Sequence, residues 1–237
     1  MQKLRNLHPK LGTRKLLYEL KSKLSESEIS IGRDSFFSLL RSSGMLIKNK
    51  RRYKRTTYSD HGYRFYPNLK QHMDIKLPNT VWVADITYIS VIKGRFVYLA
   101  LLTDSCSRKI VGYYVGESLE AIGAMNALKM AFKQLPKGKE VVHHSDRGIQ
   151  YCCNAYKSLL ATRGAVISMT EQNHCYENSQ AERVNGILKH EYGLDEKFKD
   201  INQVRTVVKQ VVNLYNYSRP HLALDYKYPA DVHSELA

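Results

Sequence analysis

Three acidic residues occupy positions from which carboxylates can do metal-dependent chemistry. Asp85 interrupts the apolar run WVADITYI, Asp146 ends the run EVVHHSD, and Glu182 lies near the start of NSQAERVNGILKHE. An acid inside an apolar strand costs several kcal/mol unless it is paired or binds a metal ion. Clustered carboxylates repel one another, and Mg²⁺ or Mn²⁺ prefers such hard oxygen ligands. Two such ions about 3.5–4 Å apart activate the attacking oxygen and stabilise the leaving oxygen at a phosphodiester.

Each acid also has an ordinary structural interpretation. Asp146 suits a turn, Glu182 suits a helix N-terminus, and Asp85 suits the surface of an edge strand. All three stand at predicted strand or helix positions that a single fold can bring together, and this favours the chemical interpretation. Asp104 also ends a predicted strand, but the serines beside it favour a turn.

The elements that must position these acids follow from hydrophobic periodicity. Strands are predicted at 80–92, 95–104, 109–117, 140–146 and 165–170, and helices at 118–135, 154–164, 178–194 and 201–217. Lys93-Gly94 predicts a hairpin turn, and Ser118 is a candidate helix cap. The order β-β-β-α-β-α-β-α predicts an α/β protein with a mixed sheet, and it resembles the ribonuclease-H-like fold. The first and fourth strands are neighbours in that fold, so we expect Asp85 and Asp146 to meet at one edge.

The charge of the chain predicts an anionic partner. The 237 residues carry 37 Lys and Arg against 22 Asp and Glu, a net charge of +15. Nucleic acid is the commonest partner of such a protein, although a basic enzyme without one is an alternative. Residues 1–75 hold 17 of the basic and 6 of the acidic residues. This asymmetry predicts a basic N-terminal module at 1–47, a basic linker at 48–76, and a core with a C-terminal helical extension at 77–237.

Two short helices are predicted in the N-terminal module, at 13–24 and 32–44. They suit a DNA-binding helix-turn-helix with Arg33 and Arg41 on the second helix, or a plain helical hairpin. The basic tract KNKRRYKRTTY that follows suits phosphate contacts or an arm in a DNA groove, or a solvated linker. Its candidate DNA-binding residues are Lys50, Arg51, Arg52, Lys54 and Arg55.

Three blocks around the acids resemble the catalytic blocks of DDE insertion-sequence transposases of the group related to retroviral integrases. These blocks are WVADITYI, HHSDRGIQY and NSQAERVNGILKHE. Thirty-five residues separate Asp146 from Glu182, the spacing of that group's D-D-35-E signature, and Lys189 stands where the group has a basic residue. LTDSCSRKIVGYYV, YNYSRPHLAL and the N-terminal HPKLGTRKLLYELK extend the resemblance over nearly the whole chain.

The resemblance implies a transposase in which Asp85, Asp146 and Glu182 bind two Mg²⁺ or Mn²⁺ ions. Water then attacks a phosphodiester at the end of the element, and the freed 3′-OH attacks another strand. The implied partners are the terminal inverted repeats, target DNA and further copies of the chain in a synaptic complex. Seven residues, about two helical turns, place Glu182 and Lys189 on one helix face, so the acid can hold metal while Lys189 contacts DNA.

Several residues near the acids take lesser roles in this interpretation. Arg147 and Arg183 are further candidates for DNA contacts, and His144 and Asn178 are candidates for supporting roles. The role of His143 stays open. The residues Tyr215, Arg219 and His221 brace the core or touch DNA, and the sequence does not decide between these roles.

The chain lacks the heptads of a leucine zipper. Full-length members of the group commonly receive a zipper and another helix-turn-helix from an upstream reading frame, so we expect a downstream-frame product or a fragment of the fusion. An upstream-frame protein is then a further partner. No apolar run suits a membrane span and no secretory signal is present, which predicts a cytoplasmic, nucleoid-associated bacterial protein.

Two other functions remain as alternatives. One is a transposase-derived DNA-binding protein that keeps the core as a scaffold, and the intact acids count against it. The other is a ribonuclease-H-like, structure-selective nuclease that hydrolyses strands without joining them. Lys189 and the C-terminal signature favour the transposase over this nuclease.

Overall fold

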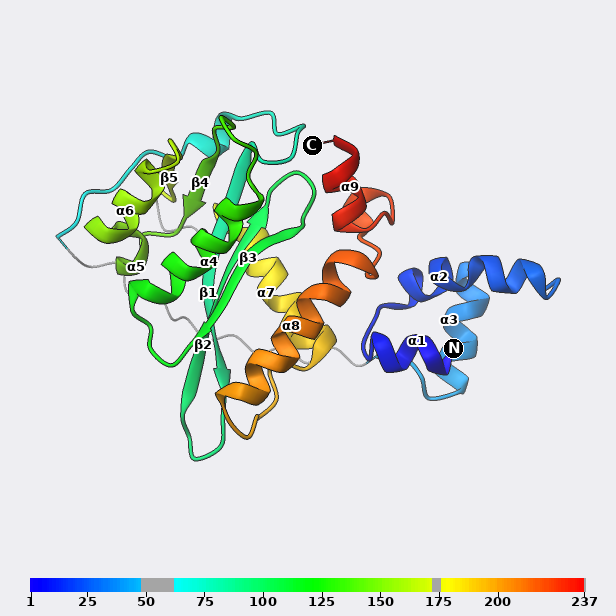
Figure 1. The fold of residues 1–237 in the computed structure, drawn as a ribbon. Helices are drawn as coiled ribbons and strands as arrows, with labels where there is room; N and C mark the ends of the chain where they lie inside the picture. Colours follow the sequence, from blue (N-terminus) through cyan, green and yellow to red (C-terminus); the bar gives the residue numbers. More distant parts are fainter. Residues whose placement is uncertain (48–61, 172–175, 237) are drawn as a thin grey trace.

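The five runs predicted as strands all form strands, each within two residues of its predicted ends. The computed structural model describes residues 1–47, 62–171 and 176–236 (Figure 1). Its strands are β1 (Val81–Ser90), β2 (Phe96–Asp104), β3 (Ile110–Gly116), β4 (Val142–Ser145) and β5 (Val166–Met169). Its helices are α1 (Gln2–Leu7), α2 (Thr13–Glu26), α3 (Arg33–Ser42), α4 (Ala121–Gln134), α5 (Ile149–Cys152), α6 (Asn154–Ala161), α7 (Ser179–Tyr192), α8 (Ile201–Tyr217) and α9 (Pro229–Leu236), with 3₁₀ turns η1 (Leu69–His72) and η2 (Leu222–Leu224).

The strands form one mixed sheet in the order β3-β2-β1-β4-β5. β1 pairs antiparallel with β2, and β2 pairs antiparallel with β3. Lys93 and Gly94 join β1 to β2 with φ angles of 62° and 68°, the conformation that matches the twist of a tight hairpin. β4 lies parallel to β1, and β5 lies parallel to β4, because a helical crossover precedes each of them. The prediction that the first and fourth strands are neighbours is confirmed.

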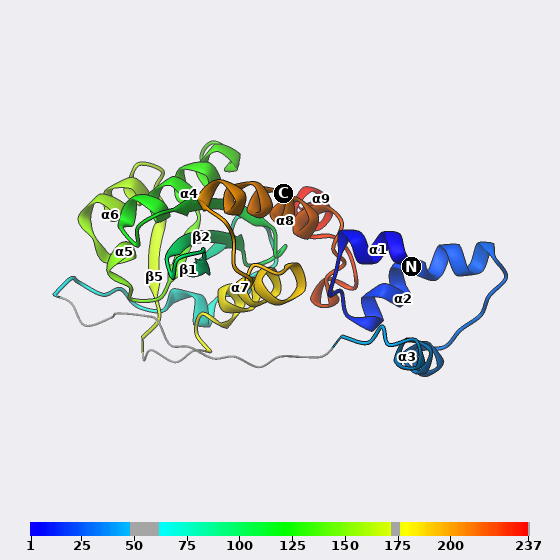
Figure 2. The same ribbon diagram turned by 90° about the horizontal axis from the view of Figure 1, so that it is seen from below.

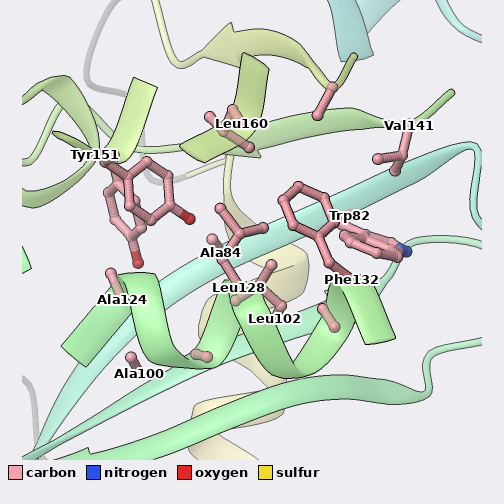
Figure 3. Close-up of a cluster of buried hydrophobic side chains, with 14 of the residues drawn as sticks. Trp82, Ala84, Ala100, Leu102, Ala124, Leu128, Phe132, Val141, Tyr151 and Leu160 are labelled. Atoms are coloured by element: carbon pink, nitrogen blue, oxygen red, sulfur yellow. The ribbon is translucent and has the colours of Figure 1, made fainter. Parts of the chain in front are cut away.

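Alternate strand residues enter hydrophobic cores on opposite faces of the sheet. Trp82 and Ala84 of β1 point to the face that α4, α5 and α6 cover, where they join Leu128 of α4 (Figure 3). Leu99 and Leu101 of β2 point to the other face and pack with apolar residues of α7 and α8. Figure 2 shows α4 and α7 on opposite sides of β1 and β2. The sheet is therefore covered on both faces, as the order of elements predicts.

Helix ends agree with the sequence where a strong stop or cap is present. α8 has the predicted bounds, and the Asp200 side chain accepts a hydrogen bond from the Gln203 N–H at 2.9 Å. Gly193 ends α7 with a φ of 77°. The prediction that Ser118 caps α4 is wrong, because Glu120 precedes the helix and the intervening residues carry the chain from β3 onto the sheet face. Nowhere in the described ranges is a helix both long enough and apolar enough for a membrane span.

The N-terminal module has a small core of its own. Leu16 and Leu20 of α2 are buried with Leu11 and with Phe36 and Leu40 of α3. The module lies beside α8 and the C-terminal segment, away from α4, α5 and α6 (Figure 1). Six residues connect α2 to α3, which is more than the three or four of a typical helix-turn-helix. The whole basic tract, 48–58, lies outside the described residues, so its role as a linker stays a prediction.

Gly112 of β3 allows the close approach of α4 to the sheet, since a Cβ at this position would clash with the carbonyl oxygen of Ala127. We expect Gly112→Ala to lower the free energy of unfolding by about 1–3 kcal/mol, because the helix must shift. Gly123→Ala, within α4, is the matched control. Its Cβ would meet only the Tyr114 ring, at 3.8 Å, so it should raise that free energy by about 0.5–1 kcal/mol. Urea unfolding measures both, and effects of the same sign would contradict this account of the contact.

Candidate active site

Asp85 and Asp146 come together because their strands are parallel neighbours. In the pairing of β1 with β4, Val83 lies opposite His144. If this register is extended by two residues toward the C-terminal ends of both strands, Asp85 lies opposite Asp146, the first residue beyond β4. Side chains alternate along a strand, so Asp85 shares a face with Val83, which packs against Ala181 of α7. Both aspartates therefore belong to the α7 side of the sheet.

Helix α7 is fixed over β1 by its first turn, and this fixes Glu182. Ala181 packs against Val83 in a small buried cluster. Asn178, the residue just before the helix, donates from Nδ2 to the carbonyl oxygen of Ala84 at 3.0 Å. Glu182 follows Ala181 directly, so these contacts bring its carboxylate to the side of the sheet that holds the two aspartates.

The three carboxylates interact electrostatically. Burial raises the pKa of Asp85 from 3.8 to about 7, and the negative charges of Asp146 and Glu182 add to this effect. Burial and the charge of Asp146 also raise the pKa of Glu182. Across the described part of the chain, no three His, Cys, Asp or Glu side chains are grouped closely enough to hold a metal ion as they stand. The acids are thus neighbours that repel one another.

Two hydrogen bonds hold the Asp85 carboxylate in place. Oδ2 accepts from Asn185 Nδ2 at 2.8 Å, and Oδ1 accepts from the N–H of Ile86 at 2.9 Å. Both bonds favour the ionised carboxylate and so oppose the effect of burial on its pKa. Sequence reasoning missed Asn185. The available signal was its position one helical turn after Glu182, where the two side chains share a face of α7.

Two buried amide oxygens beside Asp85 have no hydrogen-bond partner. They are Oδ1 of Asn178 and Oδ1 of Asn185, the two residues whose Nδ2 atoms bind Ala84 and Asp85. A buried acceptor without a donor costs about 1–3 kcal/mol. The site therefore has an unfilled capacity to accept hydrogen bonds next to its carboxylates.

Lys189 lies on the same side of α7 as Glu182. Its Nζ is 4.3 Å from the centroid of the Tyr88 ring, a cation–π contact with β1. Burial lowers the pKa of Lys189, while the charges of Asp85 and Asp195 act in the opposite direction. The negative charge of Asp85 therefore acts on the Lys189 ammonium group, and Tyr88 is a second residue that sequence reasoning missed.

The two histidines of β4 are both built into the protein interior. His143 hydrogen-bonds the Tyr156 hydroxyl at 2.8 Å, and burial lowers the pKa of His143 to about 3. His144 hydrogen-bonds Ser168 Oγ through Nδ1 at 2.9 Å and the carbonyl of Glu177 through Nε2 at 3.2 Å. Burial lowers its pKa to about 4. His144 thus braces the chain just before α7, and its supporting role in the site stays a prediction.

Asp104 stabilises the turn between β2 and β3 and also binds the segment before β1. Its side chain is fully buried and accepts hydrogen bonds from the N–H of Asn79 at 2.6 Å and from the N–H and hydroxyl of Ser107 at 2.7 and 2.8 Å. It pairs in register with Trp82, three residues along β1 from Asp85. These contacts agree with the turn that its neighbouring serines predict.

Two of the predicted DNA-binding arginines flank the acids. Arg147, next to Asp146, donates from Nε to the carbonyl of Thr170 at 2.6 Å, and its guanidinium lies 4.6 Å from the Phe65 ring centroid. Arg183, next to Glu182, is exposed on α7. Arg147 therefore connects the turn after β4 to the end of β5, while Arg183 is open to solvent.

The other predicted DNA-binding residues are remote from the acids or lie outside the described residues. Arg33 and Arg41 are exposed on α3, where Arg33 pairs with its neighbour Asp34 at 2.8 Å. Figure 1 shows α3 well away from the sheet. The residues outside the described ranges are Lys50, Arg51, Arg52, Lys54 and Arg55. Contact of any of these residues with DNA stays a prediction.

The raised pKa of Asp85 predicts how stability depends on pH without divalent cations. The folded state holds the Asp85 proton more tightly than the unfolded state, so this contribution to stability is present below pH 4 and is lost as the pH rises to about 7. Asp85→Asn should therefore exceed wild type in free energy of unfolding by roughly 2–4 kcal/mol at pH 8, with the difference shrinking toward pH 4. Urea unfolding in EDTA measures this. Asp74→Asn, whose side chain is 74% exposed, is the control, and a pH-independent gain would contradict the assignment.

The hydrogen bond from Asn185 predicts a second effect on the same carboxyl group. Asn185→Ala removes a donor that stabilises the ionised Asp85, so the pKa of Asp85 should rise further. Carbon-13 NMR titration of the aspartate carboxyls, without divalent cations, measures the shift. Asn202→Ala on the exposed face of α8 is the matched control. An unchanged Asp85 titration in Asn185→Ala would show that this bond does not hold the carboxylate.

The sequence matches a known domain family and known bacterial proteins. Two families described as integrase core domain match residues 76–175 and 163–229. The 31 kDa protein of insertion element IS600 from Shigella sonnei is 34% identical over 221 residues, which is 92% of this chain and 79% of that protein. The transposase for insertion sequence element IS629 from the same organism is 31% identical over 94% of this chain and 74% of its own length.

Solved integrase structures share the fold. The catalytic core domain of HTLV-2 integrase in complex with magnesium superposes with a TM-score of 0.52 at 18% identity, over 66% of this chain and 97% of its own. A chain of the simian T-cell lymphotropic virus intasome gives a TM-score of 0.55 at 17% identity, over 98% of this chain and 73% of its own. The predicted ribonuclease-H-like sheet is confirmed. With the identities to the bacterial proteins, these findings show that the chain belongs to the IS3 family of insertion-sequence transposases, which have an integrase core domain.

Proposed function

We propose that the protein is a DDE transposase that cleaves and joins DNA strands at the ends of an insertion sequence. The observation that supports this proposal is that Asp85, Asp146 and Glu182, from three separate elements, interact electrostatically on the α7 side of the sheet. Perturbed carboxylate pKa values of the kind found at Asp85 are typical of functional sites. These three acids would be the catalytic residues.

Two Mg²⁺ or Mn²⁺ ions are the proposed cofactors, held by oxygens of Asp85, Asp146 and Glu182. The raised pKa values of Asp85 and Glu182 support this fit, because bound cations offset the repulsion that contributes to them. The partnerless amide oxygens of Asn178 and Asn185 suit the water molecules that Mg²⁺ keeps in its coordination shell. When bound, the ions would activate the attacking oxygen and stabilise the leaving oxygen.

The residues around the acids have positioning roles in this proposal. Asn185 orients the Asp85 carboxylate through its Oδ2. Asn178 and His144 hold the start of α7 and thereby set the place of Glu182. Lys189 would leave or share its contact with Tyr88 to bind a DNA phosphate. Water would cleave the phosphodiester at the element end, and the freed 3′-OH would attack the second strand, so each step exchanges one oxygen for another at phosphorus without a covalent enzyme intermediate.

Terminal inverted repeats and target DNA are the proposed partners. The module at 1–47 would bind DNA through exposed residues of α3, the linker at 48–76 would follow the backbone, and the core at 77–237 would hold the scissile strand. The proposed contacts are Lys189, Arg33, Arg41, Lys50, Arg51, Arg52, Lys54, Arg55, Arg147 and Arg183. A homo-oligomeric synaptic complex at the bacterial nucleoid, with or without an upstream-frame protein, is the proposed assembly. The simian T-cell lymphotropic virus intasome supports an assembly of this kind.

The test is strand transfer of a labelled element-end duplex with Mg²⁺ or Mn²⁺. We expect wild type to release a 3′-OH and to join it to target DNA. Asp146→Asn should reduce both products by more than about a hundredfold, since changing a metal ligand costs more than changing a residue behind it. Asp74→Asn, on the surface, is the charge-matched control and should react as wild type does.

Two outcomes of this assay would contradict the proposal. Equal joining by Asp146→Asn and wild type would exclude the three acids as the catalytic set. Wild-type cleavage of structured DNA without any joining would favour the nuclease, the second candidate function, whose chemistry needs the same carboxylates and a water nucleophile alone.

A further inference from the structure

A cluster of buried polar groups without partners lies where α7, α8 and the β2–β3 turn meet the N-terminal module. Seven buried side-chain nitrogen or oxygen atoms of the described residues lack a hydrogen-bond partner, and four of the seven are at this place. They are Arg108 Nε, Tyr215 Oη, Arg219 Nη1 and His221 Nδ1. We call these four residues the junction cluster. None of these four residues contacts Asp85, Asp146 or Glu182 in the interactions described above. The burial of their partnerless polar atoms therefore needs an explanation other than the carboxylate site.

The residues of the junction cluster lie close together, and two of them are fully buried. The guanidinium of Arg219 lies 5.6 Å from the Tyr215 ring centroid, and the rings of Tyr215 and His221 are 6.5 Å apart. Tyr215 and Arg219 are 0% and 1% exposed. Arg108 and His221 are half-buried, and the exposed Arg183 of α7 is near enough for its charge to act on Tyr215 and His221. Arg183 is therefore a solvent-exposed cation near the cluster.

One carboxylate, that of Glu191, pairs with two of the cations around the junction cluster. Arg219 donates from Nε and Nη2 to the two oxygens of Glu191, each at 2.8 Å. Lys15 Nζ, from the N-terminal module, lies 3.7 Å from the same carboxylate. Burial would raise the pKa of Glu191, but these cations and Arg183 outweigh it and lower that pKa. The negative charge of Glu191 is thus already shared, while Nη1 of Arg219 remains without a partner.

The rest of the surroundings add positive charge. Burial lowers the pKa of His221 to about 3, and the charges that act on it, from Arg219, Lys15, Arg108 and Arg183, all lower it further. Asp104 lies near Arg108 and its charge raises the pKa of Arg108, while its oxygens already accept hydrogen bonds from Asn79 and Ser107. The four cations still outnumber the two acids, Glu191 and Asp104. The junction cluster is therefore a buried site with excess positive charge and several unused hydrogen-bonding atoms.

An ordered water molecule would satisfy these hydrogen bonds but leave the positive charge uncompensated, whereas an oxyanion does both. We propose that the junction cluster binds a phosphate group, held by Arg219 Nη1, Tyr215 Oη and Arg108 Nε, with the exposed Arg183 as a further cation. Neutral His221 would donate its Nδ1–H. The phosphate is either a free ion or part of a DNA backbone, and the recognising chemistry is the same for both. The site is distinct from the carboxylates and does not depend on their catalysis.

Calorimetric titration of the full chain with inorganic phosphate, at constant ionic strength in chloride, tests this proposal. We expect saturable binding to wild type. Tyr215→Phe and Arg183→Gln should each weaken it by about tenfold, the effect of losing one hydrogen bond or charge to an anion. Tyr217→Phe, exposed on the same helix, and Lys209→Gln, exposed on α8, are the matched controls and should bind as wild type does. Circular dichroism checks that Tyr215→Phe and Arg183→Gln fold.

Two further measurements distinguish a free phosphate ion from a DNA phosphate, and distinguish failure of this proposal from failure of the proposed transposase function. Competition by a short DNA duplex of arbitrary sequence would assign the site to a DNA backbone phosphate, and phosphate binding without competition would assign it to the free ion. Asp146→Asn should bind phosphate normally even though it fails in strand transfer. Absence of saturable binding to wild type, or binding to Tyr215→Phe equal to that of Tyr217→Phe, would overturn the proposal and leave water as the partner of these groups.

Discussion

The parallel pairing of β1 with β4 is the constraint on which the candidate site depends. β4 has only four residues, and its register against β1 decides that Asp146 emerges beside Asp85 on the face that α7 covers. A slip of one residue would turn Asp146 to the opposite face. His143 and His144 of β4 oppose this slip, because both are buried and each is hydrogen-bonded on its own face, His143 to Tyr156 and His144 to Ser168.

The fold holds like charges together at a cost that the surrounding residues reduce but do not remove. Asn185 and the N–H of Ile86 stabilise the ionised Asp85, and Lys189 places a positive charge within reach. Burial and the other acids still raise the pKa of Asp85 to about 7. Such a site lowers the free energy of unfolding, and burial of the hydrophobic cores on the two faces of the sheet must offset this loss.

The sequence predicts the strands, the long helices and the meeting of Asp85 with Asp146, because periodic runs and element order determine these features. Short helices such as α1 and α5 escape prediction, since one or two turns carry too little periodicity to distinguish them from loops. Asn185 escapes prediction for another reason. Its bond to Asp85 spans 100 positions of sequence and depends on how α7 is rotated about its axis, which contacts with the sheet decide. The junction cluster likewise exists only where separate segments converge.

Helix α7 connects the two ends of the molecule. Its first turn carries Glu182, and its last turn carries Glu191, whose carbonyl accepts the N–H of Lys10, and Tyr192, whose hydroxyl hydrogen-bonds His8 at 2.9 Å. The N-terminal module is therefore attached to the helix that positions a proposed catalytic acid. A helix of 14 residues behaves as a short rigid rod. A displacement of the module strong enough to pull on Glu191 must then either break this attachment or move Glu182 relative to the two aspartates on the sheet.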